Sequence, residues 1–286
     1  MSEVLFARVA VIGAGTMGHG IAQVCAVTGA SVAVTDVDDA ALSRGREGVR
    51  ASLERMVSKG RLDAAARDAA IARVRWTTDL DAAVSDAQLV VEAAPERMAL
   101  KRELFTRVDA AAPADALLGS NTSSLSITEI ASAVRDPSRV VGLHFFNPVP
   151  VMELLEVVRG VRTRDEVIDR ALGFAAQLGK TPIVVRDVPG FATSRLGVAL
   201  GAEAIRMLEG GVASAEDIDK AMELGYRHPM GPLRLTDLVG LDVRLAILEH
   251  LHREVGEQFR PPALLRQMVR AGKLGKKSGE GFYVWR

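Results

Sequence analysis

Two residues twelve positions apart, His144 and Glu156, have side chains that can move a proton and orient the group that moves it. His144 directly follows the apolar run 140–143, which predicts a buried strand that delivers a side chain to the crevice of an open α/β sheet. Side chains alternate along a strand, so the next run places Glu156 on one face with Met152, Leu154 and Val158. A buried carboxylate needs a partner, and His144 is the nearest ionisable candidate. The pair is predicted to be a general base and its orienting acid.

A structural explanation of both residues stays open at this point. A single histidine at a strand end is often a satisfied structural residue, and Glu156 could belong to a solvated edge strand. The rest of the chain decides between the two explanations.

A glycine-rich turn near the N-terminus predicts a nucleotide site. The apolar run 9–12 is followed by Gly13-Ala-Gly-Thr-Met-Gly18, which fits G-x-G-x-x-G, and helical periodicity then continues until Gly29. Glycines at these places let the backbone approach a pyrophosphate at a helix N-terminus. The expected cofactor contacts in this turn are Gly13, Gly15, Thr16, Met17 and Gly18.

Asp36 ends the second expected strand, 31–35, and lies 36 − 13 = 23 positions after the first glycine. A carboxylate at this place accepts hydrogen bonds from an adenosine ribose and repels a 2′-phosphate. The expected cofactor is therefore NAD rather than NADP.

Strand and helix patterns alternate through the first two thirds of the chain. Further strands are expected at 89–92, 117–120 and 181–185, and helices at 39–59, 62–73 and 97–111. This order predicts an α/β fold with a doubly wound, Rossmann-like, mostly parallel sheet. Beyond Asp187-Val-Pro-Gly the periodicity is helical, at 191–208, from 214 onward, and at 233–239, 241–255 and 264–271. We predict an NAD-binding domain at 1–186 and an all-helical domain at 187–286.

Composition narrows the function classes. The 36 basic and 36 acidic residues cancel, which counts against nucleic acid as a partner. The single cysteine, Cys25, excludes an intrachain disulfide, and we expect no metal site. The chain shows neither a signal-peptide pattern nor an apolar run of the ~20 residues that a membrane span requires. A cytoplasmic protein without a membrane partner is expected.

Two polar clusters suggest substrate contacts. Asn121-Thr-Ser-Ser124 follows a strand with more hydrogen-bonding side chains than the cap of one helix requires. Ser52 and Lys59 lie about two turns apart on one helix face. That face could meet phosphates, although a basic helix face is more often only solvated.

Together these segments resemble the L-3-hydroxyacyl-CoA dehydrogenase family, including its 3-hydroxybutyryl-CoA members, over nearly the whole chain. The most specific words are Gly13-Ala-Gly-Thr-Met-Gly18, Ser120-Asn-Thr-Ser-Ser124, Gly142-Leu-His-Phe-Phe-Asn-Pro-Val-Pro150, Asp187-Val-Pro-Gly-Phe191, Pro229-Met-Gly-Pro232 and Gly279-Glu-Gly-Phe-Tyr283. The resemblance implies an NAD-dependent enzyme that reversibly oxidises (S)-3-hydroxyacyl-CoA thioesters and forms a homodimer through its helical domain.

The resemblance also implies roles for single residues. His144 would be the catalytic base, Glu156 its orienting acid and Ser123 a substrate contact. Ser52 and Lys59 would contact coenzyme A, so the resemblance replaces the interpretation of this helix face as merely solvated. The implied cofactor contacts outside the glycine turn are Asp36, Glu96, Lys101, Asn121, Asn147 and Lys277.

One residue departs from the family pattern, P-G-F-x-x-N-R. Ser194 stands where an asparagine usually helps to hold the substrate, and serine has a shorter reach and no amide. Three alternatives stay open: a 3-hydroxyadipyl-CoA dehydrogenase, a sugar-acid dehydrogenase resembling L-gulonate dehydrogenase and lambda-crystallin, and a non-catalytic NAD-binding protein. Ser194 is the reason for the last of these.

Overall fold

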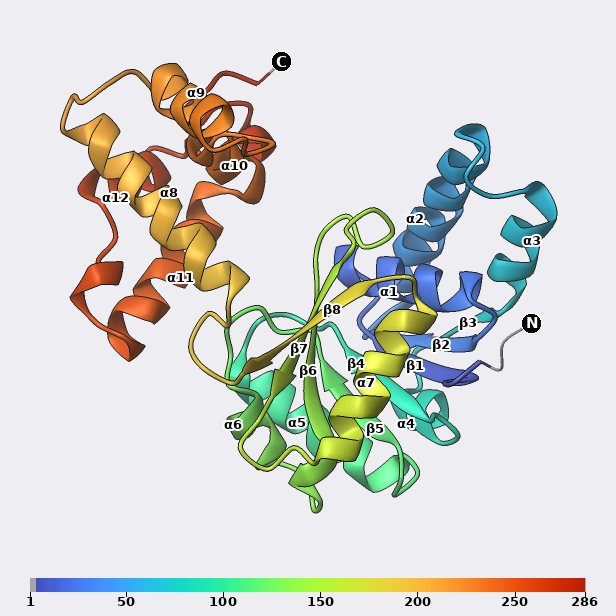
Figure 1. The fold of residues 1–286 in the computed structure, drawn as a ribbon. Coiled ribbons are helices and arrows are strands. Elements are labelled where there is room, and N and C mark those ends of the chain that lie inside the picture. The colour runs from blue at the N-terminus through green and yellow to red at the C-terminus, as the bar shows by residue number, and fades with distance from the viewer. Residues whose placement is uncertain (1–3, 286) are drawn as a thin grey trace. The chain divides into compact units, whose positions relative to one another are not determined.

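Strand β1 (Arg8–Ile12) lies inside an eight-stranded sheet, and its last four residues are buried. The computed structural model describes residues 4–285, which divide into one unit ending at Asp187 and a second unit beginning at Val188 (Figure 1). The remaining strands are β2 (Ser31–Thr35), β3 (Val74–Thr77), β4 (Leu89–Glu92), β5 (Leu117–Ser120), β6 (Val140–Phe145), β7 (Leu154–Arg159) and β8 (Thr181–Arg186).

The strand order is β3-β2-β1-β4-β5-β6-β7-β8. All neighbours are parallel except β6 and β7, which are antiparallel. The order reverses between β1 and β4, which is where open α/β sheets bind ligands beyond their carboxyl ends. The prediction of a doubly wound, mostly parallel sheet is confirmed.

Helices connect the strands and cover the sheet. Their bounds are α1 (Thr16–Val27), α2 (Asp39–Ser58), α3 (Ala64–Ala72), α4 (Leu80–Val84), α5 (Met98–Ala111), α6 (Ile127–Ala131), the 3₁₀ turn η1 (Pro137–Arg139) and α7 (Asp165–Gln177). One buried cluster joins α1 and α7 to one sheet face through residues such as Ile21, Phe145 and Phe174. Side chains alternate along β6, so His144 points to the opposite face from Phe145.

The sequence patterns miss or misplace some elements of this unit. They give no expectation for β3, α4 or α7. They also extend the β7 run back to Met152, which lies before the strand and is 39% exposed. Glu156 shares its face within β7 with Leu154 and Val158 only.

The second unit is helical, as predicted, apart from isolated β-bridges that join Glu280 to Gly275 and to Val284. It consists of α8 (Thr193–Glu209), α9 (Ala215–Gly225), α10 (Pro232–Val239), α11 (Leu241–Glu254), α12 (Ala263–Arg270) and the 3₁₀ turns η2 (Glu257–Phe259) and η3 (Lys276–Ser278). Apolar residues such as Val198, Leu233 and Leu248 form its core. The buried carboxylate of Asp237 accepts hydrogen bonds from the amides of Phe282 and Tyr283, and so fixes the C-terminal segment.

In the described part of the chain, no helix combines the length and apolar character that crossing a bilayer requires.

Candidate active site

A pocket of about 730 Å³ opens at the carboxyl ends of β1 and β2. Its lining includes Gly13, Gly15, Thr16 and Met17 from the glycine turn, and Asp36 from the end of β2. The first amides of α1 have no intrahelical acceptor and carry the positive end of the helix dipole. The pocket thus places anion-binding amides next to a carboxylate.

Each of the three motif positions is a glycine for a different physical reason. Gly13 has φ +99°, and a Cβ there would lie 2.7 Å from the carbonyl oxygen of Ala93. A Cβ on Gly18 would lie 1.7 Å from the carbonyl oxygen of Gly13, so this glycine lets α1 pack against the turn. A Cβ on Gly15 would meet no atom within 4 Å, so protein packing does not require this glycine. The open space at Gly15 fits the close approach of a pyrophosphate.

Asp36 is held in place by the backbone around it. One carboxylate oxygen accepts a hydrogen bond from the amide of Ala14 and the other from the amide of Val37, each at 2.7 Å. A carboxylate has about four acceptor sites, so lone pairs remain for the hydroxyls of a ribose. The geometry fits the expected NAD.

His144 and Glu156 lie directly opposite one another in the antiparallel pair β6–β7. Their side chains share one sheet face, and His144 Nδ1 lies 2.6 Å from Glu156 Oε2. His144 is 7% exposed and Glu156 is fully buried. The structure therefore brings together the two side chains that strand alternation paired.

The hydrogen bond sets the chemistry of the imidazole. An ionised carboxylate only accepts hydrogen bonds, so Nδ1 carries a proton and the lone pair of the neutral ring lies on Nε2. The ring of Phe146 lies beside the imidazole, with ring centroids 4.5 Å apart. A neutral histidine in this tautomer can accept a proton at Nε2 while the carboxylate stabilises the resulting cation.

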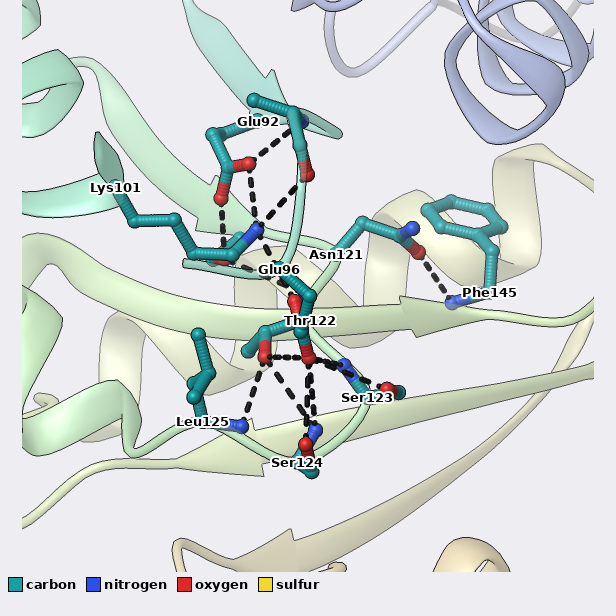
Figure 2. A network of polar contacts seen from close by, with 11 residues as sticks. Glu92, Glu96, Lys101, Asn121, Thr122, Ser123, Ser124, Leu125 and Phe145 are labelled. Atoms are coloured by element: carbon teal, nitrogen blue, oxygen red, sulfur yellow. Dashed lines mark hydrogen bonds and ion pairs between the residues drawn. The ribbon is translucent and has the colours of Figure 1, made fainter. Parts of the chain in front are cut away.

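Ser123 lies in a loop that Glu96 holds together (Figure 2). Glu96 Oε1 accepts hydrogen bonds from Thr122 Oγ1 at 2.7 Å, from the Ser123 amide at 2.9 Å and from Ser123 Oγ at 3.2 Å. It accepts longer ones from the amide and hydroxyl of Ser124. Glu96 is thus the centre of the polar loop after β5.

Lys101 connects this loop to the sheet (Figure 2). Its ammonium lies 2.7 Å from Glu92 Oε1 and 3.4 Å from Glu96 Oε2, and Glu92 also accepts a hydrogen bond from Ser120 Oγ at 2.6 Å. The side chains of Lys101 and Glu92 are 1% and 0% exposed. Buried charges of this kind are stable only when paired, so Glu92, Glu96 and Lys101 form one connected charge network.

The electrostatics of Glu96 follow from these contacts. Partial burial acts to raise the pKa of Glu96, but the charge of Lys101 and the hydrogen bonds from Thr122 and Ser123 outweigh it and lower that pKa. Glu96 is therefore an anion near neutral pH and acts as an acceptor only.

The other expected site residues lie in several places. Asn121 Oδ1 accepts a hydrogen bond from the Phe145 amide at 2.9 Å and so links the end of β5 to β6 (Figure 2). Asn147 is exposed just beyond β6. Ser52 is half-buried on α2, and Lys59 is the exposed residue at the end of that helix.

Two expected residues belong to the helical unit. Ser194 is half-buried in the first turn of α8. Lys277 Nζ lies 2.7 Å from Asp242 Oδ2 in an ion pair at the start of α11.

The sequence patterns missed two residues that shape the site. Glu92 is a carboxylate at the end of an otherwise apolar run, and its burial was the signal that it needs a cation. Lys180 donates hydrogen bonds to the carbonyls of Val149 and Met152 and so fixes the loop after His144. The sequence around Lys180 contains no pattern that indicates this role.

Among the described residues no group of three or more His, Cys, Asp or Glu side chains is arranged to hold a metal ion.

Comparison with known proteins gives consistent matches over both units. The profile of the 3-hydroxyacyl-CoA dehydrogenase NAD-binding domain matches residues 8–188, and that of the 3-hydroxyacyl-CoA dehydrogenase C-terminal domain matches residues 190–285. A 3-hydroxybutyryl-CoA dehydrogenase of Mycobacterium tuberculosis is 47% identical over 281 residues, which cover 97% of this chain and 98% of that protein.

Solved structures agree with the sequence matches. The crystal structure of FadB2 from M. tuberculosis superimposes with a TM-score of 0.95 at 47% identity, and covers 98% of this chain and 99% of that one. The (S)-3-hydroxybutyryl-CoA dehydrogenase PaaH1 from Ralstonia eutropha gives a TM-score of 0.94 at 42% identity, with the same coverage.

Proposed function

This chain belongs to the 3-hydroxyacyl-CoA dehydrogenase family, and from that premise we propose that it oxidises (S)-3-hydroxyacyl-CoA reversibly to 3-ketoacyl-CoA with NAD. The observation that carries the proposal is the buried pair of His144 and Glu156, which lies in the same unit as the glycine-lined pocket. A short acyl chain such as 3-hydroxybutyryl is the first substrate to test, because the compared relatives act on it.

His144 is the proton acceptor in this mechanism. Its Nε2 lone pair takes the proton of the 3-hydroxyl, and Glu156 keeps Nδ1 protonated and stabilises the imidazolium. Bound NAD would supply the hydride acceptor for C3. In the reverse direction the imidazolium returns its proton to the oxygen of the reduced ketone.

Ser123 and Ser194 position the oxygen that changes between hydroxyl and carbonyl. Ser123 Oγ donates its proton in a hydrogen bond to Glu96. The lone pairs of the Ser123 oxygen can therefore accept a hydrogen bond from a substrate hydroxyl. To donate to a ketone, Ser123 must rotate its proton away from Glu96. Ser194 has the more limited role that its short side chain permits.

The cofactor contacts of this proposal lie mainly around the pocket. The turn amides bind the pyrophosphate, and Asp36 binds the adenosine ribose. Glu96, Asn121 and Asn147 would meet the nicotinamide half. Lys101 supports Glu96 through their ion pair, and Lys277, which pairs with Asp242, would be a further cofactor contact.

Coenzyme A is assigned to α2. Ser52 and Lys59 lie seven residues apart on one face of this helix, which offers a hydroxyl and an ammonium to phosphate groups. We divide the roles of the chain at residue 186, with cofactor binding in 1–186 and acyl-group contacts and dimerisation in 187–286.

A homodimer is part of the proposal. Leu235, Leu238, Val239 and Val243 on α10 and α11 are 39–42% exposed, and a second copy would cover such apolar side chains. The expected cytoplasmic location also stays a proposal, in keeping with the one buried, unpaired thiol at Cys25.

The test is a comparison of kcat/KM for (S)-3-hydroxybutyryl-CoA and for L-gulonate, each with NAD and with NADP. We expect turnover of the thioester with NAD to exceed the other three combinations. Preference for gulonate would favour the sugar-acid alternative, and NADH binding without any turnover would favour a non-catalytic protein.

A further inference from the structure

His19, in the first turns of α1, lies where the cofactor pocket meets the contact between α1 and α2. Its side chain lines the pocket together with Gly15 and Thr16. The helix α2 packs along α1 (Figure 1), and a Cβ on Gly48 of α2 would lie 3.1 Å from His19 Nε2. The absence of a side chain at Gly48 thus makes room for the imidazole. The ring has a fixed place between the pocket and α2, and it takes no part in the proton transfer at His144.

One ring nitrogen of His19 is occupied by the glycine turn. Nδ1 lies 2.9 Å from the carbonyl oxygen of Gly15. A carbonyl oxygen only accepts hydrogen bonds, so Nδ1 carries a proton, and Nε2 is the nitrogen that gains or loses one. Protonation of Nε2 would create a cation with a second N–H donor at the contact between α1 and α2.

Gly48 begins a polar stripe on α2. Ser52, Arg55 and Lys59 follow it at intervals of four, three and four residues, so all four lie along one side of the helix. Arg55 is close enough to His19 for its charge to affect the titration of the ring. In the described part of the chain, neither Arg55 nor Lys59 forms an ion pair. His19 therefore extends this α2 stripe of donors to the edge of the cofactor pocket.

The neutral ring is the prevailing form of His19 near neutral pH. Burial lowers the pKa of His19 below its ordinary 6.5, the hydrogen bond to Gly15 opposes this effect, and the charge of Arg55 lowers that pKa further. The other charged side chains that line the pocket are Asp36, Asp38, Arg44 and Arg107. An anion placed beside Nε2 would stabilise the protonated ring and raise its pKa again.

We propose that His19 and Arg55 together bind a phosphate group, and that His19 takes up a proton when the phosphate binds. This inference rests on the proposed dehydrogenase function, which brings two phosphate-bearing molecules to this unit, NAD and the coenzyme A thioester. Imidazolium and guanidinium groups both donate charge-assisted hydrogen bonds to phosphate oxygens. The recognition chemistry is the same for either molecule, and separate titrations with NADH and with coenzyme A distinguish the two sources.

Proton uptake gives the binding a defined pH dependence. Between the pKa of His19 in the free protein and its higher pKa in the complex, binding takes up a proton, so the affinity rises as the pH falls. Above the higher pKa the ring is neutral in both states, and below the lower pKa it is charged in both, so the affinity is then constant. A ring that only packed against α2 would produce no such dependence.

The test measures the affinities of NADH and of coenzyme A for the wild type and for His19→Gln at about pH 8 and about pH 6. We expect the wild type to bind one of these ligands about five- to tenfold more tightly at the lower pH, the effect of a pKa difference approaching one unit. His19→Gln should lose this gain. The 3′-phosphate of coenzyme A itself titrates near about pH 6, so the readout is the difference between wild type and variant.

A second variant tests the phosphate contact without changing the histidine. Arg55→Met should weaken binding of the same ligand about three- to fivefold, the effect of one exposed charge pair. The exposed Arg50 lies on the opposite side of α2, so Arg50→Met is the matched control and should bind as the wild type does. Dephospho-coenzyme A, which lacks the 3′-phosphate, shows which phosphate of coenzyme A is bound.

Calorimetry in two buffers of different ionisation heat counts the protons that accompany binding. At about pH 7 the wild type should take up a fraction of a proton with the ligand, and His19→Gln should take up less. This measurement requires no turnover. It therefore separates the role of His19 from the dehydrogenase reaction.

The outcomes distinguish the two sources and the two hypotheses. A pH effect confined to NADH supports a contact to the cofactor pyrophosphate, and one confined to coenzyme A supports a contact to its phosphates. Equal pH dependence of wild type and His19→Gln with both ligands would overturn the proposal, as would unchanged affinities in Arg55→Met. Binding of both ligands without oxidation of any thioester would refute only the dehydrogenase function, whereas a wild type that binds neither would overturn both.

Discussion

His144 Nδ1 and Glu156 Oε2 lie 2.6 Å apart because the two residues oppose one another in the register of β6 and β7. The register fixes both backbones, so the two side chains leave the same sheet face directly beside one another. The arrangement keeps one tautomer of the imidazole and supports the charge that it gains.

The first prediction concerns this pair. His144→Gln should lower kcat by about 10²–10⁴-fold and leave NADH binding unchanged, because a proton acceptor is lost while the pocket stays intact. Glu156→Gln should lower kcat similarly. The double variant should be little worse than either single one, since the two residues act together. The measurements are steady-state kinetics and NADH fluorescence titration, with His250→Gln as the control; additive losses would contradict the coupling.

A second prediction separates packing from binding in the glycine turn. Gly15→Ala should change the unfolding free energy by no more than about 0.5 kcal/mol, since its Cβ meets no protein atom, yet weaken NADH binding at least about tenfold. Gly18→Ala should destabilise by about 1–3 kcal/mol or more, because its Cβ would overlap the Gly13 carbonyl. Urea unfolding and NADH titration of both variants provide the check. Normal NADH affinity in Gly15→Ala would mean that no pyrophosphate approaches there.

A third prediction concerns the buried ammonium of Lys101. Lys101→Met should lower the unfolding free energy by about 3–5 kcal/mol, because Glu92 would be left as an unpaired buried charge. The neighbouring Arg102, whose side chain is 49% exposed, provides a matched control, and Arg102→Met should cost at most about 1 kcal/mol. Denaturant melts at neutral pH distinguish the two variants. Adding Glu92→Gln to Lys101→Met should recover part of the lost unfolding free energy. A double variant no more stable than Lys101→Met would argue against a charge effect.

The fourth prediction is a pH dependence that originates at Glu96. Its pKa is lower in the folded protein than the ordinary 4.5, so its contribution to stability is complete above 4.5 and is lost as the pH falls through the folded pKa. Between about pH 7 and about pH 3, Glu96→Gln should lose less unfolding free energy than the wild type. If the unfolding free energies of the two proteins fell in parallel with pH, Glu96 would titrate alike in the folded and unfolded states.

Much of the site is encoded locally in the sequence. The glycine turn, the position of Asp36 and the alternation that sets Glu156 on a buried face depend on a few consecutive residues, because strand period and turn sterics are short-range properties. For this reason the fold class, the cofactor and the pairing of His144 with Glu156 could be predicted. Met152 was misplaced because alternation does not mark where a strand begins.

The tertiary structure alone decided which charges meet. Lys101 on α5 pairs with Glu92 at the end of β4, and the buried Arg139 pairs with Asp109, which lies 30 residues earlier on α5. Both pairings depend on how the folded elements place these side chains, and the pairing energy of a buried charge exists only in that packing. The sequence shows which residues carry charge, whereas only the fold determines which of these charges neutralise one another.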